Sequence, residues 1–225
     1  MTIATHDIRL ASNADPASRT KRDAILDAAA AIFSQQGFAG ASIDAIAVKA
    51  GVSRQTVYNQ VGDKEKLFKA MVAELTQRSS AGFFRVLDTF PISPTNLQSE
   101  LVDFACRLLR TYSCDPNSRW LIKLIENEAS RYPELFEVWK EYGPGRKYPA
   151  IAARLAQLAL AGLIELDDPI LASRQFMALL TAEIRTDVLM GKQPSDAEID
   201  RIATNAVTTF LKAFAARGHG APGLG

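Results

Sequence analysis

The chain has 225 residues, 48% of them hydrophobic, and a formal net charge of +1. The hydrophobic content excludes a largely disordered protein, and the small excess of positive charge disfavours a nonspecific nucleic-acid coat. No apolar run approaches the ~20 residues that span a bilayer, and the first eighteen residues lack the basic start and apolar block of a signal peptide. We therefore expect a cytoplasmic protein without a membrane partner, with flexible tails at residues 1–18 and 218–225.

Residues 25–38 predict a first helix, because their apolar residues recur at the spacing of one buried helical face: Ile25, Ala28, Ala29, Ile32 and Phe33. Arg19, Lys21 and Arg22 precede this helix, where they are placed to touch phosphates. Residues 19–70 carry eight Lys or Arg against five Asp or Glu, a local net charge of +3. This mild excess suits a protein that contacts a few phosphates.

Two short amphipathic segments joined by Gly51 follow, and this arrangement is typical of a helix-turn-helix. Ser42 is placed to cap the first helix, and Ser53 the second. Because glycine adopts positive φ without a Cβ clash, Gly51 permits the tight turn, and Val52 behind it wedges between the helices. Double-stranded DNA is therefore the first partner to consider.

The second helix of this pair carries hydrogen-bonding side chains at nearly every position and one clear core residue, Val57. Arg suits guanine and Asn or Gln suits adenine in the major groove, while Tyr58, Gln60 and Lys64 are better placed for phosphate contacts. The alternative is a small helical hairpin with a solvated outer face. We predict DNA contacts from Ser42, Ser53, Arg54, Gln55, Thr56, Tyr58, Asn59, Gln60 and Lys64.

The rest of the chain also reads as helical. Apolar residues from Asp63 to about Phe90 predict one long helix, stopped by Pro91 and Pro94. Further helices are expected around residues 97–109, 120–125 and 148–158. Residues 163–166 form at most a short extended link, and Gly143-Pro144-Gly145 is expected to be a turn between helices. No segment alternates with period two for long enough to argue a sheet.

The last two helices have clear start signals and a wide apolar face. Asp168-Pro169 places a cap before a proline in the first turn, and Ser195 with Glu198 forms a capping box. The final helix is apolar over more of its surface than one neighbour covers, so a second copy of the chain is expected to cover the rest. Packing within one subunit is the alternative. The residues of this face are Ile199, Ile202, Ala203, Ala206, Val207, Phe210, Leu211 and Phe214.

No catalytic, metal or cofactor site is expected. Cys106 and Cys114 are too few for a disulfide framework and are expected to be small core residues, with a redox switch as the alternative. His6 and His219 both fall in the tails. No Ser/His/Asp, Cys/His or paired-carboxylate spacing stands out, so we do not expect an enzyme.

Residues 19–75 resemble the DNA-binding domain of the TetR/AcrR family of bacterial transcriptional regulators. The resemblance runs through ILDAAAAIFSQQGF (25–38), ASIDAIAVKAGVSRQTVYNQV (41–61) and DKEKLFKAM (63–71). Where many members have Tyr, His and Phe after the residue matching Tyr58, this chain has Asn59, Gln60 and Val61. Residues 126–146 and 166–180 also resemble the C-terminal domain of the AefR-like subgroup.

The resemblance implies an all-α fold with two domains. A three-helix helix-turn-helix domain is expected at residues 19–65, and a larger helical domain for effector binding and dimerisation at residues 66–217. It also implies a dimer in which the last two helices form a four-helix bundle. The interface residues expected on this basis are Phe176, Leu180, Ile184, Ile199, Ile202, Ala206, Phe210 and Phe214.

The implied function is a ligand-responsive dimeric repressor. Two reading helices about one DNA turn apart, ~34 Å, would bind a palindromic operator, and a small-molecule effector of unknown identity would release it. Alternatives are an α-helical enzyme or sensor that uses the helix-turn-helix only as an interaction module, and a DNA-binding protein with no effector. Aromatic residues at helical spacing are also expected in a plain core. The candidate effector contacts are Phe104, Arg119, Trp120, Asn127, Glu128, Trp139, Tyr142 and Phe176.

Overall fold

The computed structural model of the chain describes residues 20–214, and within that range its regular elements are all helices. The expected all-α class is confirmed. None of the helices within residues 20–214 has an apolar stretch of the length that spans a bilayer. The elements are α1 (Lys21–Gly40), α2 (Ile43–Ala50), α3 (Arg54–Val61), α4 (Lys64–Leu87), α5 (Leu97–Cys114), α6 (Pro116–Glu128), the 3-10 helix η2 (Pro133–Phe136), α7 (Glu137–Tyr142), α8 (Pro144–Leu160), α9 (Pro169–Thr181), α10 (Arg185–Leu189) and α11 (Asp196–Phe214).

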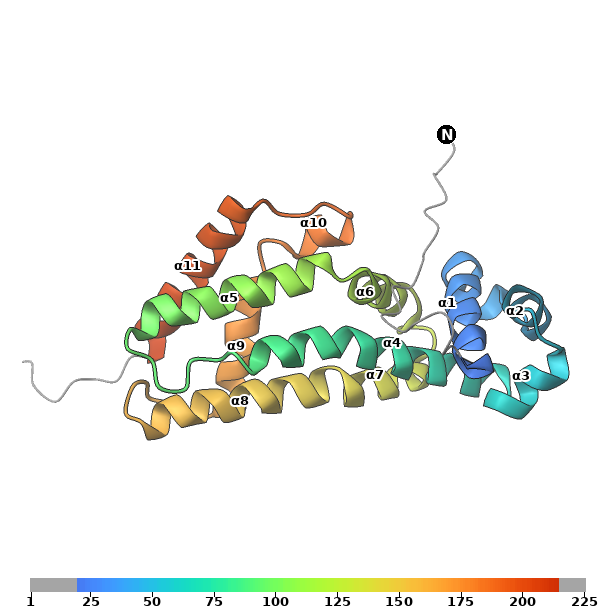
Figure 1. Cartoon of the computed structure of the whole chain (residues 1–225), viewed down its shortest axis with the longest axis horizontal. Helices are drawn as coiled ribbons and strands as arrows, with labels where there is room; N and C mark the ends of the chain where they lie inside the picture. Colours follow the sequence, from blue (N-terminus) through green and yellow to red (C-terminus); the bar gives the residue numbers. More distant parts are fainter. Residues whose placement is uncertain (1–19, 215–225) are drawn as a thin grey trace, which may run out of the picture. The chain divides into compact units, whose positions relative to one another are not determined.

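These helices form two compact units, whose elements are labelled in Figure 1. The described part of unit 1 comprises residues 20–79 and 116–142, and that of unit 2 comprises residues 80–115 and 143–214. This division differs from the domain ranges expected from the sequence, because residues 66–79 of α4, together with α6, η2 and α7, join the helix-turn-helix instead of the larger domain. The expected tails, with Arg19, His6 and His219, lie outside the described residues.

Aromatic contacts explain why residues 116–142 belong to unit 1. All five residues of the α1 stripe are buried, and Phe33 meets Phe68 of α4 edge to face at 4.9 Å between ring centroids. Phe68 in turn contacts Phe136 at 5.5 Å, and Phe38 contacts Tyr132 at 4.9 Å. Rings far apart in the sequence therefore share one core, and such pairs stabilise beyond the area that they bury.

The start of α1 is fixed by a capping box. The hydroxyl of Thr20 accepts a hydrogen bond from the Asp23 amide, and the Asp23 carboxylate accepts one from the Thr20 amide. The bonds from these two amides satisfy donors that the first helical turn would otherwise leave without partners. The Thr20 hydroxyl also donates to the Asp23 carboxylate at 2.9 Å, and this bond, followed by the one from the Thr20 amide, holds the pKa of Asp23 below its usual range.

The end of α1 bends at Gly37, which has φ 68° and ψ 177°. This backbone region is essentially restricted to glycine. A Cβ built on Gly37 would lie only 2.7 Å from Oε1 of Glu128 in α6. Glu128 is one of the candidate effector contacts, and its carboxylate lies against α1.

Lys64, at the start of α4, closes the same end of α1. Its ammonium donates hydrogen bonds to the carbonyl oxygens of Ala39, at 3.2 Å, and Ala41, at 2.9 Å. It also lies 4.8 Å from the centroid of the Phe38 ring. A cation at a helix C-terminus interacts favourably with the exposed carbonyls, so Lys64 has a structural role that its position in the sequence did not reveal.

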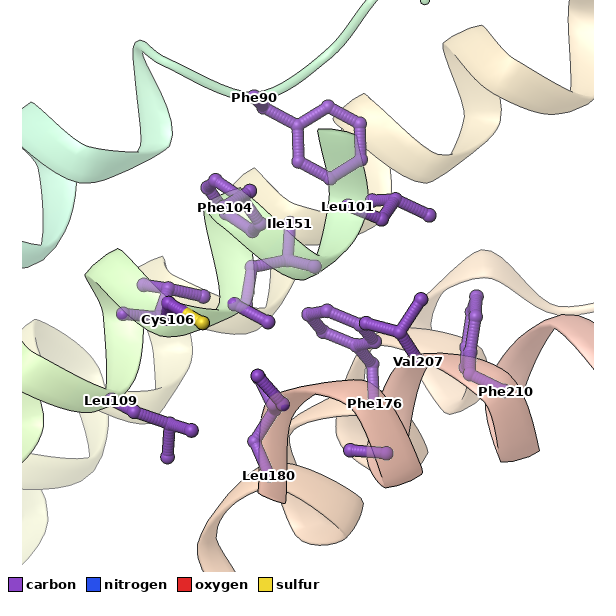
Figure 2. Close-up of a cluster of buried hydrophobic side chains, with 14 of the residues drawn as sticks. Phe90, Leu101, Phe104, Cys106, Leu109, Ile151, Phe176, Leu180, Val207 and Phe210 are labelled. Atoms are coloured by element: carbon purple, nitrogen blue, oxygen red, sulfur yellow. The ribbon is translucent and has the colours of Figure 1, made fainter. Parts of the chain in front are cut away.

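Unit 2 is built around the buried aromatic and aliphatic side chains shown in Figure 2. The ring of Phe176 in α9 is stacked with Phe104 of α5 at 6.5 Å and meets Phe210 of α11 at 5.1 Å. Helix α11 contacts both α5 and α9, and α8 contacts α9. The wide apolar face of α11 is therefore covered within one chain, so it gives no reason to invoke a second copy.

The residues expected at the dimer interface are also covered by side chains of their own chain. Seven of the eight are buried in the core of unit 2, including Phe176 and Phe210, which are 0% exposed. The eighth, Phe214, is partly buried against the same core. These side chains face the interior of their own subunit, so any contact between copies over α9 and α11 has to use outward-facing positions.

The helix caps predicted from the sequence in unit 2 are confirmed. Asp168 caps α9, its carboxylate accepting hydrogen bonds from two backbone amides, and Pro169 occupies the first turn. Ser195 and Glu198 form the expected capping box. The turn expected at residues 143–145 is wrong in extent, because α8 already begins at Pro144. Proline is well suited to the first helical position, where its missing amide hydrogen is not needed.

We predict that Gly37→Ala lowers the free energy of unfolding by about 2 kcal/mol or more, since alanine is strained at this φ and its Cβ meets Glu128. Gly40→Ala is the matched control, because its added Cβ would lie at an ordinary 3.4 Å from the Gln36 Cβ. Urea unfolding of both variants measures the difference. Equal stability of the two variants would contradict the conformation described for Gly37.

We predict that Lys64→Met lowers the free energy of unfolding by about 1–2 kcal/mol, because two carbonyls of α1 lose a charged donor while the aliphatic stem remains. Lys66→Met is the control. Lys66 pairs with Asp63 at 3.4 Å with both side chains largely exposed, and such pairs contribute little. Thermal or urea unfolding checks both variants, and an unaltered Lys64→Met protein would refute the structural role.

Candidate DNA-binding site

The helix-turn-helix is set by two serine caps and one glycine turn. Ser42 accepts a hydrogen bond from the Ala45 amide at 3.2 Å, and Ser53 accepts one from the Thr56 amide at 3.1 Å. Gly51 between them is left-handed, with φ 68° and ψ 31°. The caps and the turn expected from the sequence are thereby confirmed, and each helix starts where a side chain satisfies its first amides.

Helix α3 is anchored to unit 1 by few apolar contacts. Val57 is 0% exposed, whereas Tyr58 is 38% exposed. Arg54, Gln55, Asn59 and Gln60 are exposed as well, and Thr56 is partly buried. Figure 1 shows α3 beside α2, which it contacts. The hydrogen-bonding groups of α3 therefore lie mostly on its outer surface, as the sequence analysis expected.

The exposed side chains of α3 are paired along the helix. The side-chain Nε2 of Gln55 donates to Asn59 Oδ1 at 2.9 Å, and the guanidinium of Arg54 donates to the Tyr58 hydroxyl at 3.3 Å. Arg54 also lies 5.6 Å from the centroid of the Tyr58 ring. These contacts between residues four apart arrange the donors and acceptors in an ordered row.

Arg54 has a further partner that the sequence analysis missed. Its guanidinium lies 3.4 Å from the carboxylate of Asp44 in α2. The Tyr58 hydroxyl first, and the charge of Asp44 second, hold the pKa of Arg54 above its ordinary value. An acidic residue in the first turn of a helix is common because it complements the helix dipole, and this explains why Asp44 gave no separate signal.

Other basic groups near the proposed surface differ in availability. Lys21 and Arg22 are exposed in the first turn of α1, so they remain candidates for phosphate contact. The ammonium of Lys64 is already bound to two carbonyl oxygens of the α1 terminus. A phosphate at Lys64 would have to share this group, so its primary contacts are internal.

The candidate effector contacts are not assembled within one unit. Phe104 and Phe176 are stacked in the core of unit 2, whereas Trp120 and Trp139 lie against the core of unit 1. Arg119 and Tyr142 are partly buried and Asn127 is exposed, all in unit 1.

Two surface grooves are lined by other residues. The groove in unit 1 has a volume of about 550 Å³ and is lined by Lys69, Glu134, Glu137, Val138, Lys140 and Glu141. The groove in unit 2 has a volume of about 310 Å³ and is lined by Glu165, Asp167, Asp168, Leu171, Ala172, Gln175, Ala213 and Phe214. Neither contains a side chain from the expected effector set.

The two cysteines have different environments on α5. Cys106 is buried and donates to a carboxylate oxygen of Asp200 at 3.4 Å. Burial, and then Asp200, raise the pKa of the Cys106 thiol to about 11, so at neutral pH it holds little of the reactive thiolate. Cys114 is exposed, so the expectation that both cysteines are core residues is wrong for Cys114. Residues 20–214 contain no cluster of three or more His, Cys, Asp or Glu suited to a metal ion.

Comparison with known families covers both parts of the chain. Residues 25–71 match the family described as bacterial regulatory proteins, tetR family. Residues 99–216 match the C-terminal domain of AefR-like transcriptional repressors. The first match contains α2, the turn at Gly51 and α3, and the second contains most of unit 2.

Individual proteins support the same assignment. The HTH-type transcriptional repressor AcnR of Corynebacterium efficiens is 27% identical over 84% of this chain and 86% of its own length. EthR of Mycolicibacterium smegmatis is 30% identical over 36% of this chain. The matched part of the chain spans only 38% of the length of EthR.

Solved structures extend the likeness to the whole fold. A putative TetR-family regulator from Mesorhizobium loti is 30% identical, with a TM-score of 0.74 over 87% of this chain and 96% of that one. The flavonoid-responsive regulator FrrA is 29% identical, with a TM-score of 0.72 over 88% and 98%. With the helix-turn-helix geometry of α2 and α3, these matches establish that the chain belongs to the TetR family of DNA-binding transcriptional regulators, with an AefR-like C-terminal domain.

Proposed function

We propose that the chain is a dimeric repressor that binds a palindromic operator through α3 and is released by a small-molecule effector. The observation that carries this proposal is the row of exposed hydrogen-bonding side chains on a helix whose only fully buried residue is Val57. A helix this short and polar gains little from burial, so its outer side chains have another use. Readout of base edges requires such donors and acceptors.

The roles of the side chains follow from their chemistry. Arg54 offers paired donors suited to the two acceptors of guanine, and Gln55 and Asn59 offer the donor and acceptor suited to adenine. Ser42, Ser53, Tyr58 and Gln60 flank these groups and are assigned to phosphates, which fix the register of the helix on the duplex. The contact between Gln55 and Asn59 would have to be exchanged for contacts to the base.

Dimerisation would explain how one short helix achieves specificity. A two-fold dimer presents two copies of α3 to half-sites about one DNA turn apart, ~34 Å, and thereby doubles the contacts. We place the contact between copies on outward-facing positions of α9 and α11, because the inward positions are buried. Leu171 is 50% exposed, and Ala178 and Thr204 are exposed, so these positions are free to meet a partner.

Effector response is supported by the relatives. FrrA is described as flavonoid-responsive. The family that residues 99–216 match is described as the C-terminal domain of AefR-like transcriptional repressors. A ligand releases DNA only if it binds the non-binding state more tightly, and DNA must then weaken ligand binding by the same factor. We propose that the effector contacts come from the expected set, with Phe104 and Phe176 as candidates in unit 2.

We predict that Arg54→Ala weakens binding to a promoter duplex from the chain's own locus by about tenfold or more, since one good base contact contributes about 1–3 kcal/mol. The control is Lys212→Ala, which removes an exposed positive charge from α11. Fluorescence anisotropy at fixed salt compares the affinities of the two variants. Unchanged affinity of Arg54→Ala would count against α3 as the reading helix.

We predict that a compound that releases the promoter duplex also raises the melting temperature of the free protein. At about 100 times its dissociation constant the stabilisation is about 2.7 kcal/mol, which corresponds to roughly 5–10 °C for a chain of this size. A thermal-shift screen that includes flavonoids identifies candidates, and titration with and without DNA measures the coupling. If every stabilising compound left DNA affinity unchanged, effector release would be contradicted.

A further inference from the structure

We infer that Asp44 is a specificity-determining residue that acts by positioning Arg54, an inference that rests on the proposed function. Arg54 is the only Lys or Arg in α3. Its NH1 lies 3.4 Å from both carboxylate oxygens of Asp44, and its NH2 donates to the Tyr58 hydroxyl at 3.3 Å. The guanidinium is therefore held from two sides, by α2 and by the next turn of α3.

The charge of Asp44 is unfavourable for general DNA affinity. A carboxylate on a surface that approaches phosphates repels them, and residues 19–70 have a net charge of only +3. With a neutral residue at position 44, the protein would bind any duplex more tightly. The presence of a carboxylate next to the one guanidinium of α3 therefore points to a benefit other than affinity.

That benefit is orientation. A free arginine has many rotamers and binds phosphates of any sequence, whereas a guanidinium already held in one orientation loses less entropy when it contacts a base edge. Donation of NH1 to Asp44 also competes with donation to a phosphate. Asp44 thus lowers the affinity for wrong sites and leaves the fit to the right base intact, which is how repulsive elements create specificity.

Asp44 also lies in the first turn of α2, where a carboxylate interacts favourably with the helix dipole. The two roles have different consequences. The side chains of Arg54 and Asp44 are 60% and 65% exposed, so their ion pair contributes little to folding. Loss of a positioning contact changes DNA discrimination, whereas loss of a dipole contact changes only the stability of α2.

The test compares Asp44→Asn with Glu65→Gln, which removes the same charge from an exposed side chain in the first turn of α4. The probes are the duplex that the wild type enriches from a random library and a scrambled duplex of equal length. Asp44→Asn is expected to bind the scrambled duplex about threefold more tightly. Its discrimination between the two duplexes is expected to fall about tenfold, while Glu65→Gln keeps the wild-type ratio.

A double-mutant cycle makes the assignment specific. In an Arg54→Ala background, Asp44→Asn should leave the discrimination ratio unchanged, because the group that it positions is gone. If Asp44→Asn only lowers the melting temperature and preserves the ratio, the inference is overturned and Asp44 acts on α2 alone. A wild type that enriches no sequence overturns the proposed function as well, so the two failures are distinguishable.

Discussion

The arrangement of α3 depends on one constraint, the burial of Val57 in a helix whose start is fixed by local chemistry. Gly51 ends α2 in the left-handed conformation, and Ser53 satisfies the first amides of α3. With this start set, one buried valine is enough to decide which face of an eight-residue helix turns inward. The remaining side chains need no partners in the core, and that freedom is what makes a DNA-reading surface possible.

The local features of the fold were accessible from the sequence. Caps at Ser42, Ser53 and Asp168 follow from side chains that compete for backbone amides, and the buried stripe of α1 follows from helical periodicity. These features depend on residues a few positions apart, so a single sequence contains them. The resemblance in residues 19–75 then placed them in a known architecture.

Other features depend on contacts between distant residues and were not predicted. Tyr132 lies on Phe38, Phe136 on Phe68, and Glu128 against Gly37, so the segment from α6 to α7 belongs to unit 1. For the same reason the candidate effector contacts fall in both units, because helical spacing identifies an inward-facing residue but not the core that it joins. The roles of Lys64 and Asp44 also depend on partners in other helices, so the sequence alone does not distinguish these two residues from other charged residues.

We propose above that the outer face of α3 binds duplex DNA as one half of a symmetric dimer. Hydroxyl-radical footprinting of the chain's own upstream region is the decisive experiment. We expect two protected patches related by two-fold symmetry and separated by about one helical turn, ~34 Å, with inverted-repeat sequences beneath them. A single asymmetric patch would contradict the symmetric dimer, and no protection on any fragment from the locus would contradict DNA binding itself.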